Sequence, residues 1–183
     1  MKPKKYFNVS ELSDDLQHLH NSLNKSNDTI CVLLAANFID KCLANSLVIE
    51  LPIKDKDFIK EKLLEYNDGV LATYSSRNKI AYSMNIIDEL HYEDINTIGK
   101  IRNHFAHNHL EISFKDSEII KFCNKLTLWE KGFPPYLIEE YKKPPQANSV
   151  EICRMKFITS SIEIMNNFVA MGLIHKIIYK EDL

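Results

Sequence analysis

Residues 27–47 read NDTICVLLAANFIDKCLANSL and contain the longest apolar run of the chain, Ile30–Ala36. Asn27 and Asp28 are residue types that cap the first turn of a helix. The apolar residues that follow fall on more than one side of a helix, which is the pattern of a central helix buried by its neighbours. Pro52 then ends the segment. The stretch therefore predicts a long helix at the centre of a helical fold.

The rest of the chain also favours helices. Its 183 residues include only four glycines, and no strand-like alternation of apolar and polar residues is sustained anywhere. Apolar residues recur instead with helical spacing. We therefore predict an all-α protein, a single-domain helical bundle. Besides the central helix, we expect helices from Ser10, over about residues 56–66, 76–84 and 92–107, from Asp116, and from about Val150.

The length fits one domain with a sizeable core. We expect an N-terminal helix extension (1–27), a core (28–131), a proline-rich excursion (132–149) and a C-terminal helix that packs on the core (150–183), all within one domain, 1–183. The excursion holds four of the six prolines. It is not a domain boundary, because the apolar final helix needs the core for its burial.

Charge and cysteine content limit the function classes. The net charge is −2 and the pI is about 6.4, so the chain is not a general nucleic-acid binder, and direct DNA binding is not expected. Four cysteines lie far apart without a C-x-x-C pair, which predicts reduced, mostly buried thiols and no zinc site. The longest apolar run is shorter than the ~20 residues that span a bilayer. We expect a cytoplasmic protein with no membrane association, no metal and no cofactor.

One group of residues points to a specific chemistry: Arg102, Asn103 and His107, near the end of the helix expected over 92–107. Asn103 and His107 are four residues apart and share a helix face, and Arg102 lies beside that face. A histidine titrates near neutral pH and can move a proton to or from the 2′-hydroxyl and the leaving oxygen of RNA. An arginine can bind the phosphate. The alternative is structural, because cations stabilise the C-terminal end of a helix.

Two further residues are candidates for the same site. His104 is a candidate auxiliary or RNA-binding residue; it lies three residues before His107, but no Asp or Glu completes a metal-ligand set at helical spacing. Arg77 is either a second phosphate contact or the partner of a buried carboxylate such as Asp40 or Asp94.

Residues 102–107, RNHFAH, match the R-x4-H signature of the HEPN superfamily in its common R-N-x-x-A-H form. The similarity extends beyond this motif, and the chain resembles the mannitol operon repressor family over about residues 28–172. The stretches that carry the resemblance are 33–40 (LLAANFID), 75–82 (SSRNKIAY), 94–107 (DINTIGKIRNHFAH), 112–116 (ISFKD) and 154–158 (RMKFI).

The resemblance implies a helical bundle of the HEPN type, often a homodimer that brings two copies of the motif together. Many HEPN proteins are metal-independent endoribonucleases of toxin–antitoxin and anti-phage systems. For this chain that implies RNA cleavage by 2′-hydroxyl attack in a composite dimer cleft, with Arg102, His107 and Asn103 as catalytic residues and an antitoxin as a partner. The mannitol operon repressor branch is named for transcriptional repression, yet this chain has no recognisable helix-turn-helix reader. The alternative is therefore a non-enzymatic regulator that acts through a protein partner.

Overall fold

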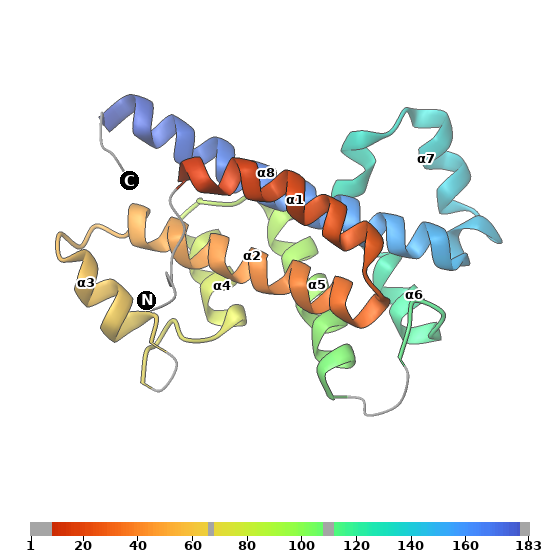
Figure 1. Ribbon diagram of the computed structural model, residues 1–183, viewed down its shortest axis with the longest axis horizontal. Helices are drawn as coiled ribbons and strands as arrows, with labels where there is room; N and C mark the ends of the chain where they lie inside the picture. The colour runs from red at the N-terminus through yellow and green to blue at the C-terminus, as the bar shows by residue number, and fades with distance from the viewer. Residues whose placement is uncertain (1–8, 66–67, 108–111, 180–183) are drawn as a thin grey trace.

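The computed structural model describes residues 9–65, 68–107 and 112–179, and these residues form helices and no strands (Figure 1). The predicted all-α class is confirmed. The α-helices are α1 (Val9–Lys25), α2 (Asp28–Glu50), α3 (Lys56–Phe58), α4 (Tyr74–Ser83), α5 (Glu89–His107), α6 (Ser117–Cys123), α7 (Pro135–Lys142) and α8 (Val150–Tyr179), with a π-helical turn at Ile59–Leu63 and 3-10 turns at Leu128–Gly132 and Gln146–Asn148.

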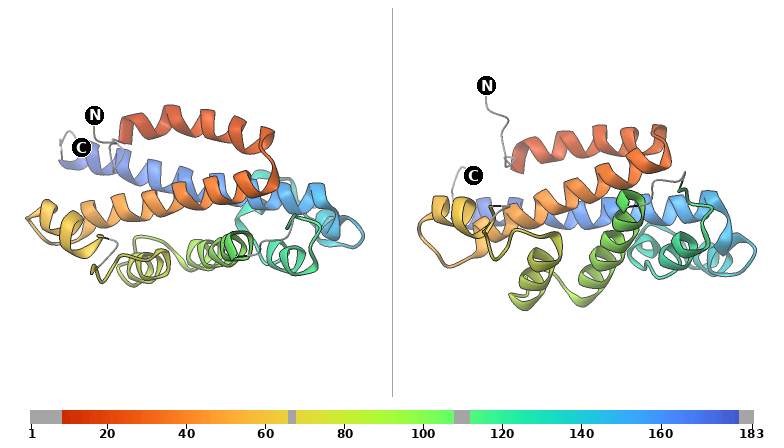
Figure 2. Two further views of the ribbon diagram at one scale, coloured as in Figure 1. Left: turned by 60° about the horizontal axis from the view of Figure 1, so that its bottom comes forward. Right: turned by 90° about the horizontal axis from the view of Figure 1, so that it is seen from below.

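The central helix is α2, as its apolar pattern predicts. It packs against α1, α4, α5 and α8. Figure 2 shows α1, α2 and α8 running side by side, with α4, α5 and α6 beneath them. The Asn27 side chain caps α2 by accepting a hydrogen bond from the Ile30 amide at 2.9 Å. By length and composition α2 is the one described helix that meets the criteria for a membrane span, and here four helices of the bundle cover it.

One arginine of α8 joins four segments of the chain. The Arg154 guanidinium forms an ion pair with the Asp28 carboxylate at the start of α2. It also donates to the carbonyl oxygens of Leu23 (2.7 Å) and Ser26 (2.6 Å), at the end of α1 and just after it. The second carboxylate oxygen of Asp28 accepts from the Phe114 amide at 3.1 Å, in the connection between α5 and α6. These contacts fix the end of the bundle at which α1 turns into α2.

Two helices begin earlier than the sequence pattern predicts, because polar residues outside the apolar pattern cap them. The Thr73 hydroxyl accepts from the Ser76 amide (3.1 Å) and the Ser76 hydroxyl accepts from the Thr73 amide (3.3 Å), so α4 begins at Tyr74. The Asp88 carboxylate accepts from the His91 amide (2.9 Å) at the start of α5.

Two other expectations need correction. The helix expected over about residues 56–66 is a short α3 followed by a π-helical turn that ends at Leu63, and residue 66 lies outside the described residues. Asp116 does precede α6, but its carboxylate accepts from the Ser113 amide (2.9 Å) and makes no capping bond to the helix. One carboxylate oxygen of Asp116 thus bonds to the local turn at Ser113 and not to the first turn of α6.

The proline-rich excursion is ordered and carries α7, which has Pro135 in its first turn. Aromatic rings join this region to the bundle: the Trp129 ring centroid lies 5.9 Å from that of Phe133 and 6.4 Å from that of Tyr141. The ammonium group of Lys156, a buried residue of α8, lies 5.2 Å from the centre of a Trp129 ring. The excursion therefore has a small satellite core of its own.

The Arg154 contacts predict a large loss of stability when that side chain is replaced. Arg154→Met leaves one carboxylate oxygen of Asp28 and two carbonyl oxygens without their donor and should lower the free energy of unfolding by about 3 kcal/mol. Arg154→Lys keeps the charge but cannot reach all three acceptors, so it should fall between Met and wild type. Urea unfolding followed by circular dichroism measures both. The control is Arg102→Lys, because Arg102 is exposed and its replacement should change the free energy of unfolding by at most about 0.5 kcal/mol. An equal loss of stability in Arg154→Lys and Arg102→Lys would contradict the stabilising role of the Arg154 contacts.

Candidate functional site

Helix α5 carries four of the predicted site residues, Arg102, Asn103, His104 and His107, and lies between α4 and α6, with α2 packed against it; the fifth, Arg77, lies on α4 (Figure 1). Its buried stripe includes Ile95, Ile98, Ile101 and Phe105, the same residues that define its apolar periodicity in sequence. Because these side chains face the core, Arg102 and Asn103 are left on the exposed side. The helical period therefore fixes which residues of the motif can meet a ligand.

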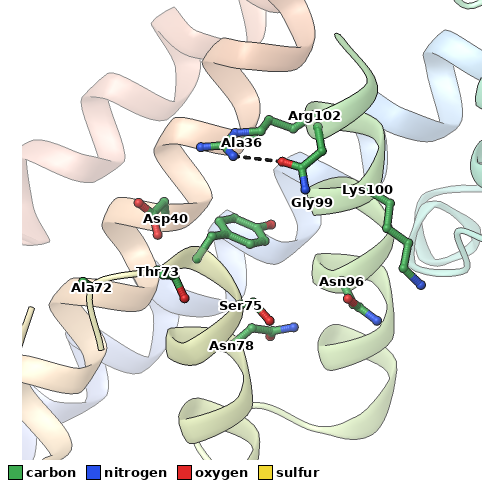
Figure 3. A pocket seen from close by; sticks show the side chains of 12 residues that line it. Ala36, Asp40, Ala72, Thr73, Ser75, Asn78, Asn96, Gly99, Lys100 and Arg102 are labelled. Carbon is green, nitrogen blue, oxygen red and sulfur yellow. Dashed lines mark hydrogen bonds between the residues drawn. The ribbon is translucent and has the colours of Figure 1, made fainter. Parts of the chain in front are cut away.

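Arg102 and Asn103 line a pocket of about 410 Å³ between α2, α4 and α5 (Figure 3). The Arg102 guanidinium donates to the side-chain oxygen of Asn103 at 2.9 Å. Figure 3 shows Arg102 at one end of the pocket and Lys100 beside Asn96 at the other. Two predicted site residues thus meet at a concave, polar surface of the kind that binds small molecules.

A tyrosine and a glycine set the spacing of α4 and α5 at this pocket. The Tyr74 hydroxyl donates to the Ile95 carbonyl oxygen at 3.0 Å, which ties its ring to α5. Gly99 lies directly beneath the ring: a Cβ atom there would come within 2.9 Å of the Tyr74 Cε1 atom. Burial raises the pKa of Tyr74 well above its usual range; the charge of Asp40 adds to the rise and that of Arg102 opposes it.

Two of the residues that line the pocket each have a side-chain oxygen that is fully buried and has no hydrogen-bond donor among the described residues: Asp40 Oδ1 and Asn78 Oδ1. Neither Asn78 nor its lining neighbour Asn96 is singled out by motif or spacing. Both fall inside stretches that carry the family resemblance, 75–82 and 94–107, and that was the signal available in sequence.

The two histidines of the motif lie outside this pocket lining. His107 is exposed at the last position of α5, one helical turn after Asn103. His104 faces α6: its Nε2 atom lies 3.4 Å from a carboxylate oxygen of Glu118, and its ring centroid lies 5.4 Å from that of Phe122. The structure therefore brings together Arg102 and Asn103, and it places His104 on the other side of the helix.

Arg77 is buried, and all three nitrogen atoms of its guanidinium donate hydrogen bonds. Its Nη1 atom donates to the Asp40 carboxylate at 2.7 Å, the ion pair that is one of the two uses expected for it. Its Nε atom donates to the Leu71 carbonyl oxygen at 2.8 Å, and Nη2 donates to those of Leu64 and Ala72 at 3.1 Å each. With these partners Arg77 connects α2, α4 and the segment before α4.

The other carboxylate considered for Arg77 has a different role. Asp94 is buried and accepts from the backbone amides of Thr127 (3.0 Å) and Leu128 (2.9 Å), at the start of the 3-10 turn. Burial raises the pKa of Asp94, and the two backbone donors oppose that rise.

Metal-binding side chains do not gather within the described residues: no group of three or more His, Cys, Asp or Glu side chains is close enough to hold an ion. All four cysteines are buried and free, as predicted. Cys123 and Cys153 are neighbours, and the hydrogen bond between them, together with burial, raises the pKa of the Cys123 thiol.

Comparison with known proteins gives a family and a fold. The family model described as "Mannitol repressor" matches residues 15–156. The structure of MtlR from Escherichia coli, solved as the MtlR–HPr complex, covers 84% of this chain and 98% of its own, with a TM-score of 0.61 and 19% identity. YggD from Shigella flexneri 2a, described as a possible transcriptional regulator, covers 84% of this chain and 97% of its own, with a TM-score of 0.64 and 12% identity. No curated protein matches the chain significantly.

The contact between Tyr74 and Gly99 gives a test of the pocket geometry. A Gly→Ala change inside a helix normally stabilises a protein by about 1 kcal/mol. Here the added methyl group must displace a ring that is hydrogen-bonded to Ile95, so Gly99→Ala should lower the melting temperature.

The same change made in a Tyr74→Ala background should be stabilising, because the ring is gone. Thermal unfolding of the four proteins of this double-mutant cycle measures the sign in each background. A rise in melting temperature for Gly99→Ala alone would mean that the ring and the glycine are not in contact as described.

Proposed function

The chain belongs to the mannitol repressor family, and we propose that it is a non-enzymatic cytoplasmic regulator that acts by binding a protein partner. The family match over residues 15–156 carries this proposal. The E. coli MtlR, which shares the fold, was solved in complex with HPr, and that complex supports a protein partner here.

The charge of the chain favours a protein partner over direct contact with DNA. Binding to nucleic acid draws most of its affinity from cations that neutralise phosphates. The net charge of −2 provides no excess of such cations. Regulation of transcription by this chain would then pass through the partner, and an HPr-type protein is the first candidate because of the E. coli complex.

The partner proposal predicts a stable complex with the HPr-type protein from the same source. Purified chain and partner should co-elute in size-exclusion chromatography, and calorimetry should give a saturable one-site binding curve. The double variant Arg102→Ala/His107→Ala should bind with the same affinity, because the proposal assigns no role in the contact to either side chain.

Two controls make this measurement decisive. Circular dichroism must give the same helical signal for the double variant, and light scattering of the chain alone gives its oligomeric state, which the HEPN resemblance expects to be a homodimer. Absence of any heat or co-elution with a folded chain would contradict the HPr-type partner. A loss of binding in the double variant would instead mean that Arg102 or His107 is part of the surface that binds the partner.

A second function, metal-independent RNA cleavage, is favoured by one observation. Arg102, Asn103 and His107 of the R-x4-H motif are all exposed at the end of α5. In this alternative Arg102 binds the phosphate, Asn103 orients it and His107 transfers the proton, with a second copy of the chain completing the cleft.

RNA incubated with the purified chain in EDTA separates the two functions. The regulator proposal predicts no cleavage that depends on His107. The test compares wild type, His107→Ala and His18→Ala, the last being an exposed histidine of α1 outside the motif. Cleavage by wild type and His18→Ala that leaves 2′,3′-cyclic phosphate ends, and that is absent from His107→Ala, would overturn the regulator proposal in favour of the nuclease.

A further inference from the structure

We propose that Cys123 and Cys153 form a reversible disulfide in the presence of a peroxide, and that this bond ties the proline-rich excursion (132–149) to the bundle. The inference concerns the chain's own thiols and does not rest on the regulator proposal. It is carried by the contact between the two thiols, by the ammonium group beside them, and by their positions at the two ends of the segment that contains the excursion.

The first observation is a chain of hydrogen bonds that passes through both sulfur atoms. Cys123 is the last residue of α6, and Cys153 lies in the first turn of α8. The two helices pack against each other at the end of the bundle that carries α7 (Figure 1). The Cys153 thiol donates to the Ala147 carbonyl oxygen at 3.6 Å, and the Cys123 thiol donates to the Cys153 sulfur. Two sulfur atoms in contact are within reach of a disulfide when their side chains rotate.

The second observation is a cation beside this pair. Lys156, one helical turn after Cys153, is only 2% exposed, and its ammonium group donates to the Asn124 side-chain oxygen at 2.8 Å. The hydrogen bond from Cys123 lowers the pKa of the Cys153 thiol; burial opposes this fall, and the charge of Lys156 adds to it. The thiolate is the nucleophilic form of cysteine. Cys153 is therefore the thiol that reacts first, and Cys123 is the one that resolves the product.

The other two cysteines are placed differently. Cys31 and Cys42 both lie on α2. Their positions in the helix put them about 16 Å apart along its axis, which is too far for a bond between them. Burial raises the pKa of Cys31 to about 11 and that of Cys42 to about 12. Buried thiols of this kind are unreactive, so they serve as internal controls for the pair.

The two thiols and hydrogen peroxide give a balanced reaction. The Cys153 sulfur attacks one peroxide oxygen and the O–O bond breaks, which gives a sulfenic acid on Cys153 and, with the thiol proton, one water molecule. The Cys123 sulfur then attacks the Cys153 sulfur. The S–S bond forms, the S–O bond breaks, and hydroxide leaves with the Cys123 proton as a second water molecule. A small thiol such as glutathione reverses the bond by exchange and is itself oxidised to its disulfide.

Both thiols are buried, so a peroxide reaches them only when the segment that covers them opens. The cover over Cys153 is the 3-10 turn Gln146–Asn148, which packs on α8 and whose Ala147 carbonyl accepts from the thiol. An exposed hydrogen bond of 3.2 Å, from the Asn124 side chain to that of Asn148, joins this turn to the end of α6. A short turn at the surface opens at a lower free energy than the core does.

The positions of the pair give the bond a structural effect. Cys123 precedes the excursion and Cys153 follows it, and the 3-10 turn Leu128–Gly132 and α7 lie between them. The excursion has its own satellite core around Trp129, next to the main core. A disulfide closes the whole segment into a loop and so restricts the unfolded chain. The oxidised chain therefore holds the excursion against the bundle more firmly than the reduced chain does.

The test is oxidation of the folded, full chain. Reduced protein is treated with hydrogen peroxide, its remaining thiols are alkylated under denaturing conditions, and its peptides are mapped by mass spectrometry. We expect a linked Cys123–Cys153 peptide that disappears with dithiothreitol, while Cys31 and Cys42 stay alkylated. The melting temperature should rise on oxidation and return to its first value on reduction.

Two variants separate the pair from its cover. In Cys123→Ala, peroxide should leave a sulfenic acid on Cys153 that dimedone traps, and the melting temperature should not rise, because the resolving thiol is gone. Asn148→Ala removes the hydrogen bond across the cover and should speed disulfide formation about threefold. The control is Asn37→Ala, an exposed asparagine of α2, which should leave the rate unchanged. Circular dichroism confirms that each variant is folded.

Four results would overturn the proposal: no linked Cys123–Cys153 peptide from the folded chain; oxidation of Cys31 and Cys42 as fast as that of the pair; a melting temperature that oxidation does not raise; or an unchanged rate in folded Asn148→Ala. The partner measurement is made on the reduced chain, so none of these results bears on the regulator proposal.

Discussion

The burial of the Arg154 guanidinium constrains the whole bundle. A largely buried cation must have a carboxylate and hydrogen-bond acceptors around it, because leaving them unpaired costs several kcal/mol. Here the acceptors come from the end of α1, the connection after it and the start of α2, while Asp28 also accepts from the segment before α6. Four segments must therefore meet at one point. That meeting fixes the position of α2, on which α4 and α5 pack.

Sequence predicts those parts of the fold that depend on neighbours along the chain. The apolar run of α2 lies within one helix, together with its Asn27 cap, and so does the buried stripe of α5. The spacing of apolar residues is therefore enough to predict both helices. Arg77 is different. Asp40 and Asp94 were equivalent partners in sequence, and only the packing of α2 on α4 brings Asp40 to it. Asp94 is taken by backbone amides more than thirty residues later in the chain, a demand that no local pattern reveals.

Part of the candidate site can likewise be predicted from the sequence, and part of it depends on the packing of distant segments. Helical spacing correctly leaves Arg102 and Asn103 exposed, because that follows from the buried stripe of α5 alone. The pocket beside them is formed by three helices, and its lining residues Asp40 and Asn78 are 38 positions apart in the chain, with another helix between them. Neither belongs to a functional motif in sequence, since each is a polar residue inside a predicted helix. Only the packing of α2 on α4 buries one side-chain oxygen of each residue without a donor among the described residues.

The arrangement around α5 also bears on what one copy of the chain can do alone. Phosphodiester cleavage without a metal needs a phosphate-binding cation and proton-transfer groups that converge on one phosphate. Within the described part of one protomer, Arg102 bonds to Asn103, His104 faces Glu118 on α6, and His107 follows one turn later at the helix end. A nuclease would have to draw its remaining groups from a second copy. The pocket between α2, α4 and α5 differs, because all of its lining residues belong to a single chain. Cleavage by this motif would therefore depend on the assembly of two copies of the chain.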